Sequence, residues 1–531
     1  MTRLRSRFVG TVIRSIGIAC AVLSVGVAHA QQKGGTLRMV VFPEPPVLVS
    51  AANSSTFPAI VSTKIHEGLL KYDLGMKPQP SLATAWSVSP DGKTVTFQLR
   101  KGVTWHDGKP FTSADVKFSL EKVWKVLHPR GRTIFGNVTE VETPDDFTAV
   151  VKLDKPSPSM LLSLSGYESQ VVPKHIYDGA DFNTNPRLSS PIGTGPFVFK
   201  EWRKGEFIRL ERNANYWDKG KPYLDGIIVR IIPDAGATAT AFETGELDIG
   251  FFNPVPLGDV KRLSALPNLA VETKGYGYFG AQYLLEMNLR TEYVKDVRVR
   301  RAIMHGIDRQ FLVDTVWYGY GKVATGPVPS SAAPFYSADV PTYPFDVAKA
   351  NAILDEAGYK RGANGMRFKI VQTYPILSEV PRTAEYIKQA LAKIGIEVEM
   401  RTLDLGAFIR NVYSNYDFEM TNNYIYMLSD PTVGVQRLYW SENIKKGVPF
   451  ANVAGYSNPD VDRLLVAAQT ETNLQKRQAQ FKEFQQIIQR DLPLLNLFEL
   501  QLTTLYNKRV HDHTTSVDGP YASFADVYLA K

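Results

Sequence analysis

Cysteine is almost absent from this chain, and this constrains how it folds more than any other feature of the sequence. The only cysteine among the 531 residues is Cys20. The rest of the chain therefore forms no disulfide, no thiolate zinc site and no cysteine nucleophile. A chain of this length without such crosslinks is held together by its apolar cores, and we expect two or three domains.

The first thirty residues have the layout of a secretory signal. Arginines are concentrated between Arg3 and Arg14, an apolar stretch runs from Ser15 to Val27, and Ala28-His29-Ala30 supplies the small residues that a signal peptidase recognises. The apolar stretch is shorter than the ~20 residues that span a bilayer. We expect a signal peptide over residues 1–30 and a periplasmic protein after export. The alternatives are an uncleaved membrane anchor and a lipoprotein modified at Cys20.

The charge of the chain does not indicate a nucleic-acid partner. The formal net charge is +8, and four of the arginines fall in the N-terminal segment, so the remainder is only weakly basic. Arg298, Arg300 and Arg301 are typical of one solvated helix face. We expect no nucleic acid among the partners.

The second half of the chain alternates helices and strands. Ile387, Ala390, Leu391 and Ile394 fall on one face of a helix predicted over 381–394, which Gly395 ends. A strand is predicted before this helix at 368–372, and another directly after it at 396–400. Strand, helix and strand form a βαβ unit, which predicts a parallel pair with a right-handed crossover. The sequence therefore predicts an α/β fold.

The first half is richer in strands and turns. Residues 34–42 read as a first strand, and 95–99 alternate with the period of two that a half-buried strand shows. Asp91-Gly92 and Asp107-Gly108 are turn signals on either side of the second strand. Residues 112–115 open a helix with a hydroxyl cap and an early acid.

Several motifs along the chain resemble one known family, and they occur in the order and at the spacing of that family. The chain resembles the bacterial extracellular solute-binding proteins of family 5, the dipeptide, oligopeptide and nickel-binding components of ABC importers. The matching segments are His66–Asp73, Pro80–Trp86, Asp91–Val103, Trp105–Gly108, Gly193–Phe197, Asn213–Asp225, Gly245–Asp248, Val297–Ile303, Asp346–Tyr359 and Gly455–Pro459.

The resemblance implies a two-lobed periplasmic binding protein of type II with the extra subdomain of the peptide-binding cluster. Lobe one is expected at 31–278 and 498–531, with the inserted subdomain at about 70–175, and lobe two at 279–497. The resemblance further implies a monomer that closes its lobes on a small solute and docks on membrane permease subunits. It implies no catalysis and no cofactor.

Three segments are candidates for the solute site, because such clefts are lined by aromatic residues with a few polar groups. They contribute Tyr276 and Tyr278 near the expected hinge, Tyr424, Tyr426, Met427 and Asp430 in a second segment, and Trp317 in a third. The first segment matches the glycine pattern of a dinucleotide loop. A strand-like stretch follows it instead of a helix, which excludes that interpretation.

The second segment bears on the kind of ligand. In peptide binders of the family, an aspartate three residues before an Asp-Pro pair accepts the α-ammonium of the peptide, and that position is Met427 in this chain. A thioether does not neutralise an ammonium group. A standard peptide with a free amine is therefore less expected than the family resemblance alone implies. The resemblance still implies a peptide or peptide-like solute, with an oligosaccharide, opine, aromatic compound or nickel chelate as the alternative. Asp417, Glu419 and Asp430 are the substitute anchors if the alignment shifts.

Metal and enzyme motifs are weak. Only His511-Asp512-His513 resembles a metal cluster, and a solvated turn explains it better, so we expect no metal site. No nucleophile elbow or phosphate loop is present in the sequence. A secreted hydrolase stays open as the alternative from another class, because a catalytic carboxylate pair is not visible in sequence spacing.

Overall fold

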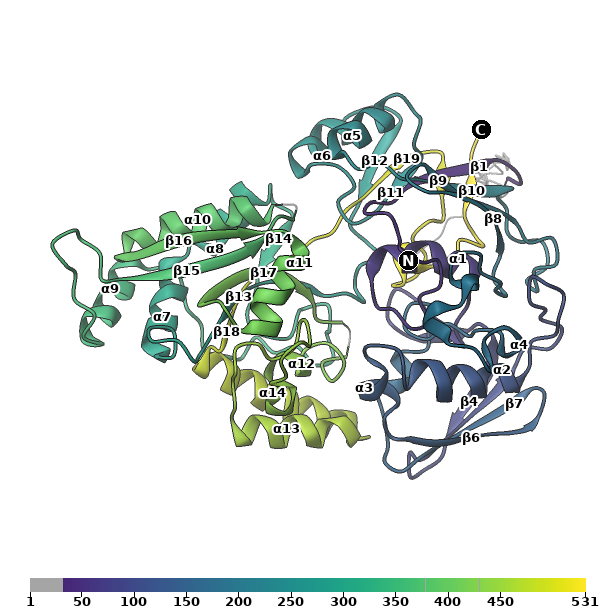
Figure 1. Ribbon diagram of the computed structural model, residues 1–531, viewed down its shortest axis with the longest axis horizontal. Helices are drawn as coiled ribbons and strands as arrows, with labels where there is room; N and C mark the ends of the chain where they lie inside the picture. Colours follow the sequence, from purple (N-terminus) through teal and green to yellow (C-terminus); the bar gives the residue numbers. More distant parts are fainter. Residues whose placement is uncertain (1–31, 378, 429) are drawn as a thin grey trace, which may run out of the picture.

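The structure is a computed structural model that describes residues 32–377, 379–428 and 430–531, so the expected signal peptide and Cys20 lie outside the described residues. It consists of two bodies, each built around its own β-sheet (Figure 1). We call residues 32–272 and 504–531 lobe one, and residues 281–500 lobe two. This arrangement confirms the predicted α/β class and the two-lobed fold.

Lobe one is organised around a seven-stranded sheet whose central strands come from distant parts of the chain. Strand β1 pairs in parallel with β10 and β11, while the other neighbours are antiparallel. In spatial order the strands are β12 (Leu269–Glu272), β19 (Thr504–Asn507), β11 (Ile249–Gly250), β1 (Thr36–Val40), β10 (Gly226–Arg230), β9 (Phe207–Arg212) and β8 (Phe197–Arg203).

Smaller strands complete lobe one. An antiparallel four-stranded sheet of the inserted region contains β4 (Ala83–Val88), β5 (Thr94–Leu99), β7 (Thr148–Leu153) and β6 (Val138–Asp145). Two further pairs are β2 (Leu70–Tyr72) with β3 (Pro78–Pro80), and β20 (Val510–His511) with β21 (Tyr528–Leu529). The alternation predicted for residues 95–99 appears in β5, where Val95, Phe97 and Leu99 are buried.

The helices of lobe one are short. They are α1 (Thr56–Ile65), α2 (Ser113–Phe118), α3 (Gly131–Phe135), α4 (Lys174–Tyr177), α5 (Ala235–Glu243) and α6 (Leu257–Ser264), with a helical turn at Gly519–Tyr521 near the C-terminus. Helix α1 is buried along almost its whole length. Its packing against the turn at Gly519–Tyr521 ties the C-terminal tail into lobe one.

Lobe two contains a six-stranded mixed sheet. In spatial order its strands are β14 (Gly321–Val323), β18 (Leu494–Leu500), β13 (Ala281–Met287), β17 (Met420–Tyr426), β15 (Phe368–Pro375) and β16 (Ile396–Leu403). Strand β15 pairs in parallel with both β16 and β17. The parallel pair β15–β16, joined through one helix, confirms the predicted βαβ unit.

Helices cover both faces of this sheet. They are α7 (Val297–Gly306), α8 (Arg309–Phe311), α9 (Val347–Glu356), α10 (Val380–Lys393), α11 (Leu405–Ile409), α12 (Gln436–Tyr439), α13 (Pro459–Thr470) and α14 (Leu474–Asp491). The buried residues of α10 include Ile387, Ala390 and Leu391, so the predicted apolar face packs on the sheet. The opposite face is covered by α13 and α14, whose Leu464 and Phe484 share a core with Leu284.

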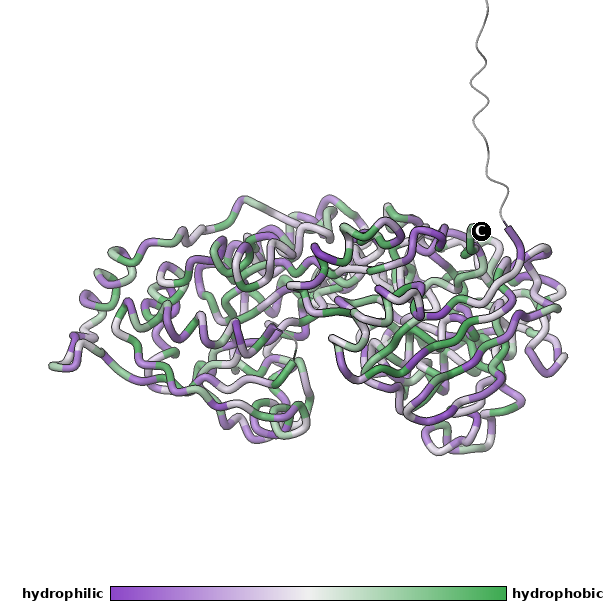
Figure 2. Tube along the Cα trace, turned by 90° about the horizontal axis from the view of Figure 1, so that it is seen from above, coloured by the Kyte–Doolittle hydropathy of each residue, from purple (hydrophilic) through white to green (hydrophobic). Residues whose placement is uncertain are grey.

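Two crossings join the lobes. The chain passes from β12 to β13 through residues 273–280 and returns from β18 to β19 through residues 501–503. The expected boundary after Leu497 falls inside β18, which still pairs in the lobe-two sheet through Leu500. Seen from above, the two bodies meet along one edge and separate along the other (Figure 2). Such paired crossings are typical of a hinge.

Helix length also bears on membrane association. In the part of the chain that the structure describes, no helix combines the length and the apolar character needed to cross a membrane.

Candidate ligand-binding site between the lobes

Aromatic side chains from both lobes and from the first crossing meet in one cluster. It consists of Tyr167, Phe252, Tyr276, Phe279, Tyr426 and Tyr521. Phe279 in the crossing is in ring contact with both sides, because its centroid lies 5.4 Å from that of Tyr426 in lobe two and 5.1 Å from that of Tyr521 in lobe one. Rings from two separate bodies therefore share one contact zone, which we call the interlobe ring cluster.

The C-terminal tail is packed directly on the first crossing. Gly275 has a φ of +81°, and a Cβ atom there would lie 3.0 Å from the Cα atom of Gly519. Glycine is needed at this position because the backbone is left-handed and a neighbouring chain approaches closely. This contact places Tyr521 beside Phe279, and Tyr521 in turn stacks on Tyr167 with 4.3 Å between the ring centroids.

A buried ion pair borders the ring cluster in lobe one. Arg130 Nε donates to Glu168 Oε2 at 2.7 Å, and the Tyr278 hydroxyl donates to Glu168 Oε1 at 2.9 Å. The Glu168 side chain is fully buried and that of Arg130 is 11 % exposed. Burial alone would lower the pKa of Arg130, but the Glu168 carboxylate outweighs this and raises the pKa above its ordinary value. Arg130 Nη2 is buried with no hydrogen-bond partner among the described residues.

A second arginine, Arg437 on α12, approaches the same zone from lobe two. Its Nε donates to the Gly434 carbonyl at 3.1 Å and its Nη2 to the Tyr426 carbonyl at 3.0 Å. Burial, and after it the charge of Arg130, lower the pKa of Arg437 to about 10, so Arg437 stays cationic at neutral pH. Through its bond to Tyr426, Arg437 lies next to the ring cluster on the lobe-two side.

A pocket lined by lobe-one residues alone lies beside the ring cluster, where β1, β10 and β11 end. Its volume is about 150 Å³. The aromatic and aliphatic part of its lining is Val40, Val41, Phe42, Phe57, Ile60, Ile232, Phe251 and Phe252. Phe252 belongs both to this pocket and to the ring cluster. The carboxyl ends of strands in an open α/β sheet are the usual place for a ligand.

The turn that forms this pocket is fixed by a polar contact with the second crossing. Phe252 and Asn253 have φ values of 57° and 59°, a left-handed conformation that is strained for residues with a side chain. The Asn253 side-chain oxygen accepts hydrogen bonds from the amide and hydroxyl of Thr503 at 2.9 and 3.0 Å. The strained turn is therefore held against the hinge.

The structure brings together some of the site residues predicted from the sequence. Tyr276 and Tyr426 are members of the ring cluster, and Tyr278 binds Glu168 at its border. Tyr424 lies next to Tyr426, with 6.3 Å between the ring centroids. The Tyr276 hydroxyl also donates to the Thr503 carbonyl at 3.1 Å, which joins the two crossings.

The other three predicted residues are occupied inside lobe two. Trp317 is fully buried and donates to the Thr383 hydroxyl at 2.9 Å. Met427 is fully buried in the core under α13 and α14. Asp430 is 3 % exposed and forms a two-bonded ion pair with Arg477, at 2.7 and 2.8 Å. Their side chains pack or pair within the lobe and do not join the ring cluster.

The substitute anchors do not reach the ring cluster either. Asp417 forms an ion pair with Arg401 at 2.8 Å, and Glu419 accepts from the Val371 amide at 2.7 Å. Both lie just before the start of β17, whereas Tyr426 is its last residue. We therefore assign no ammonium anchor to Asp417 or Glu419.

The histidine motif near the C-terminus does not form a metal cluster in the part of the chain that the structure describes. His513 is buried, and its ring lies 4.2 Å from the ring of Tyr506. Burial lowers the pKa of His513 to about 4. The prediction that the protein has no metal site stays a prediction.

Outside its candidate segments, sequence analysis missed six residues of this zone: Arg130, Tyr167, Glu168, Phe252, Arg437 and Tyr521. They lie in loops or short helices, where no hydrophobic period marks them. One weak signal was available for Phe252, because the pair Phe251-Phe252 directly follows the short strand β11. Arg130 and Arg437 are more than 300 positions apart in the chain, yet both border the ring cluster in the fold.

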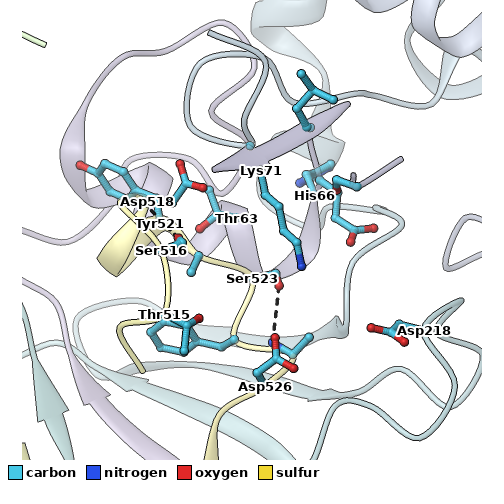
Figure 3. Close-up of a pocket in the computed structure, with 18 of the residues that line it drawn as sticks. Thr63, His66, Lys71, Asp218, Thr515, Ser516, Asp518, Tyr521, Ser523 and Asp526 are labelled. Atoms are coloured by element: carbon cyan, nitrogen blue, oxygen red, sulfur yellow. Dashed lines mark hydrogen bonds between the residues drawn. The ribbon is translucent and has the colours of Figure 1, made fainter. Parts of the chain in front are cut away.

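A separate polar pocket lies wholly within lobe one (Figure 3). Its volume is about 90 Å³, and its labelled lining residues include His66, Lys71 and Asp518. Burial lowers the pKa of His66 to about 3 and raises that of Asp518 to about 6. Like the pocket beside the ring cluster, it is lined by lobe-one residues alone.

A family model describes most of the chain. The model of bacterial extracellular solute-binding proteins, family 5, matches residues 77–446. Among curated relatives, the glutathione-binding protein GsiB of Salmonella choleraesuis is 28 % identical over 465 residues, covering 86 % of this chain and 87 % of the relative. The oligopeptide-binding protein AppA of Bacillus subtilis is 30 % identical over 498 residues, covering 89 % and 87 %.

Solved structures show the same fold. AppA of B. subtilis in complex with a nonapeptide has a TM-score of 0.80 at 26 % identity, and the match covers 94 % of this chain and 100 % of AppA. AgaA of A. tumefaciens R10 in complex with agropinic acid has a TM-score of 0.77 at 27 % identity, covering 94 % and 99 %.

Proposed function

The chain belongs to the bacterial extracellular solute-binding proteins, family 5, and on that premise we propose that it captures a peptide or peptide-like small solute between its lobes. Capture takes place in the periplasm after export. The loaded protein then delivers the solute to the permease subunits of an ABC importer.

The interlobe ring cluster is the observation that carries this proposal. Tyr426 from lobe two is in ring contact with Phe252 of lobe one and with Phe279 of the first crossing, beside the hinge. A solute that contacts both lobes favours the closed conformation. The shift toward that conformation equals the difference between the solute's affinities for the closed and the open protein. The contacts between the lobes thus supply a capture mechanism that needs no chemical step.

Relatives of this chain take different solutes on the same scaffold. The names and titles of the compared proteins mention glutathione, oligopeptides and agropinic acid. A non-peptide solute is therefore the alternative cargo for this chain within the same function. In keeping with passive capture, we propose that the protein is monomeric, that it binds no nucleic acid and that it is not an enzyme.

A ligand screen on the purified exported protein tests the function. Peptides, blocked peptides, opines, oligosaccharides, aromatic acids and nickel chelates are added singly, and the melting temperature is measured. A solute at 100 times its Kd stabilises the folded protein by about 2.7 kcal/mol, which raises the melting temperature clearly. Deletion of the gene is expected to abolish uptake of the same solute.

Two results would contradict the proposal. One is that no solute of the screen raises the melting temperature and the deletion strain still takes up each of them at the wild-type rate. The other is turnover of a bound solute by the purified protein, detected as product by mass spectrometry, which would favour a secreted hydrolase.

A further inference from the structure

Tyr318 reaches from lobe two onto lobe one. It follows Trp317 in the third candidate segment of the sequence. A Cβ atom placed on Gly258 would lie 3.2 Å from the Tyr318 hydroxyl oxygen and 3.3 Å from the ring carbon that carries it. Gly258 is the second residue of α6 in lobe one. The ring of a lobe-two tyrosine therefore lies directly over a lobe-one glycine.

The Tyr318 side chain is held in this position by its backbone and by an arginine. Its φ of 53° is left-handed, which is rare for an aromatic residue. Arg382 Nη1 donates to the Tyr318 hydroxyl at 2.6 Å, and the guanidinium carbon lies 5.0 Å from the centre of the ring. The side chain is nevertheless 43 % exposed, so it does not belong to a core. A strained and exposed aromatic residue with a fixed side chain indicates a function for that position.

Backbone conformation does not explain the glycine at position 258. The φ of Gly258 lies outside the left-handed region, so a residue with a side chain fits the backbone equally well. Glycine is also a poorer helix former than alanine. A side chain at this position would meet the Tyr318 ring first. The missing side chain thus leaves room for the approach of lobe two.

A second contact of the same kind lies elsewhere along the junction. A Cβ atom on Gly92, in the turn between β4 and β5 of lobe one, would lie 3.3 Å from the Cγ2 methyl group of Thr472. Thr472 is an exposed residue in the loop between α13 and α14 of lobe two. In Figure 1, α6 lies above the junction between the lobes, whereas α13 and α14 lie in the lower part of lobe two. The lobes therefore touch at two separate places besides the interlobe ring cluster.

Both contacts depend on how the two lobes are placed relative to each other. The lobes are joined by the crossings at residues 273–280 and 501–503, and rotation about such a pair is a hinge movement. Opening the lobes separates side chains that touch across the junction. In each contact lobe one contributes a glycine and lobe two a side chain, so the lobes approach as closely as the lobe-one backbone allows.

We propose that these two contacts, which we call the rim seats, set the closed arrangement of the lobes. Tyr318 on Gly258 and Thr472 on Gly92 hold the lobes together outside the interlobe ring cluster. A larger side chain at position 258 keeps the lobes apart. This inference goes beyond the proposed function, because it concerns how the lobes stay closed and not which solute they enclose.

A pair of engineered cysteines measures closure, since Cys20 is the only cysteine of the natural chain. The pair combines Gly92→Cys with Thr472→Cys. The control pair combines Thr472→Cys with Gly108→Cys, because Gly108 is also a turn glycine with a left-handed φ, of +85°, and no atom lies within 4 Å of a Cβ placed there. Oxidation by copper phenanthroline is followed on the exported protein without solute, by non-reducing electrophoresis. We expect the first pair to form its disulfide at least about tenfold faster than the control, because a disulfide needs Cβ atoms about 3.5–4.5 Å apart.

A bulky residue at position 258 tests the other rim seat. Gly258→Trp fills the space beneath the Tyr318 ring, and we expect it to slow oxidation of the first cysteine pair by about tenfold. Gly236→Trp is the matched control, because Gly236 is likewise the second residue of a lobe-one helix, α5, and a Cβ there meets only the Asp234 side chain. Adding Tyr318→Ala to Gly258→Trp is expected to restore much of the rate, which a general loss of folding would not allow.

Small-angle X-ray scattering gives a second measurement that needs no cysteines. Gly258→Trp is expected to increase the radius of gyration relative to the wild type and to Gly236→Trp, at an unchanged melting temperature. The inference is overturned if the first cysteine pair oxidises no faster than the control pair. It is also overturned if Gly258→Trp and Gly236→Trp give the same oxidation rate and the same radius of gyration. Because these assays contain no solute, either result leaves the proposed capture of a solute standing, and that function is decided by the ligand screen.

Discussion

The two lobes are assembled from the chain in different ways. The lobe-two sheet is built from one continuous stretch, from β13 at Ala281 to β18 at Leu500. The lobe-one sheet places β1 (Thr36–Val40) between β10 and β11, and it pairs β11 with β19 (Thr504–Asn507) from the far end of the chain. Local sequence patterns therefore describe lobe two well, whereas the lobe-one sheet depends on pairings between distant segments.

The lobes also bury different titratable groups. In lobe one, burial lowers the pKa of His66 to about 3 and that of His106 to about 4, and it lowers the pKa of His128 as well. In lobe two, burial raises the pKa of Glu286 to about 7. Buried neutral histidines destabilise a fold on acidification, whereas a buried carboxyl group that prefers its proton does so as pH rises. The two lobes should therefore respond to pH in opposite directions.

The largest expected effect is the loss of unfolding free energy when Met427→Asp places a carboxylate in the lobe-two core. The side chain is fully buried among apolar residues, so an unpaired carboxylate there costs on the order of 4 kcal/mol or more of unfolding free energy. Urea unfolding measures it. Met427→Leu is the control and is expected to cost less than about 1.5 kcal/mol. A stable variant with new affinity for free-amine peptides would show instead that position 427 faces the solute.

The next effect concerns the buried ion pair between Asp430 and Arg477 in lobe two. Asp430→Asn leaves Arg477 buried without its counter-charge and is expected to cost about 3–5 kcal/mol of unfolding free energy. Asp417→Asn breaks the more exposed pair with Arg401 and is expected to cost less than about 1 kcal/mol. Equal unfolding free energies for the two variants, with a loss of ligand binding only in Asp430→Asn, would make Asp430 a ligand contact.

Acidification is expected to destabilise lobe one more than lobe two. The folded-state pKa of His66 lies below that of the unfolded chain, so its stabilising effect is present above about pH 6.5 and is lost as pH falls toward 3. At pH 5 each such histidine costs about 2 kcal/mol. Buried acids of lobe one such as Asp518, with a pKa of about 6, offset only part of this.

Hydrogen exchange at pH 7 and pH 5 measures this loss lobe by lobe. We expect amide protection to fall mainly in lobe one. His66→Asn is expected to flatten the slope of stability against pH below pH 6, whatever its effect at pH 7. An unchanged slope would remove His66 from the explanation.

The smallest expected effect is a fall in the stability of lobe two as pH rises, opposite in sign to the pH dependence expected of lobe one. Because the folded state raises the pKa of Glu286 from 4.5 to about 7, stability falls as pH rises through this window. Glu286→Gln is expected to add on the order of 1–3 kcal/mol of unfolding free energy at pH 8 and to remove that slope. Glu397→Gln, on the exposed side of β16, serves as the control. A loss of stability at pH 8 would mean that the charged carboxylate supports the fold.

Much of the fold was predictable because its signals are local. The apolar spacing in α10 and the alternation in β16 predicted the βαβ unit, and short-range backbone hydrogen bonding makes such periods visible in the sequence. The candidate site was predicted less well. Tyr276, Tyr278 and Tyr426 lie in or beside the ring cluster, whereas Trp317 and Asp430 have partners inside lobe two.

Residue identity and spacing were enough to predict the α/β class and the family motifs, and they show that no cysteine follows Cys20. Folding in three dimensions places Phe252 both in a lobe-one pocket and in the ring cluster, and it pairs Asp430 with Arg477. Charge balance and pocket shape depend on distances through space, and the local order of residues along the chain does not encode those distances.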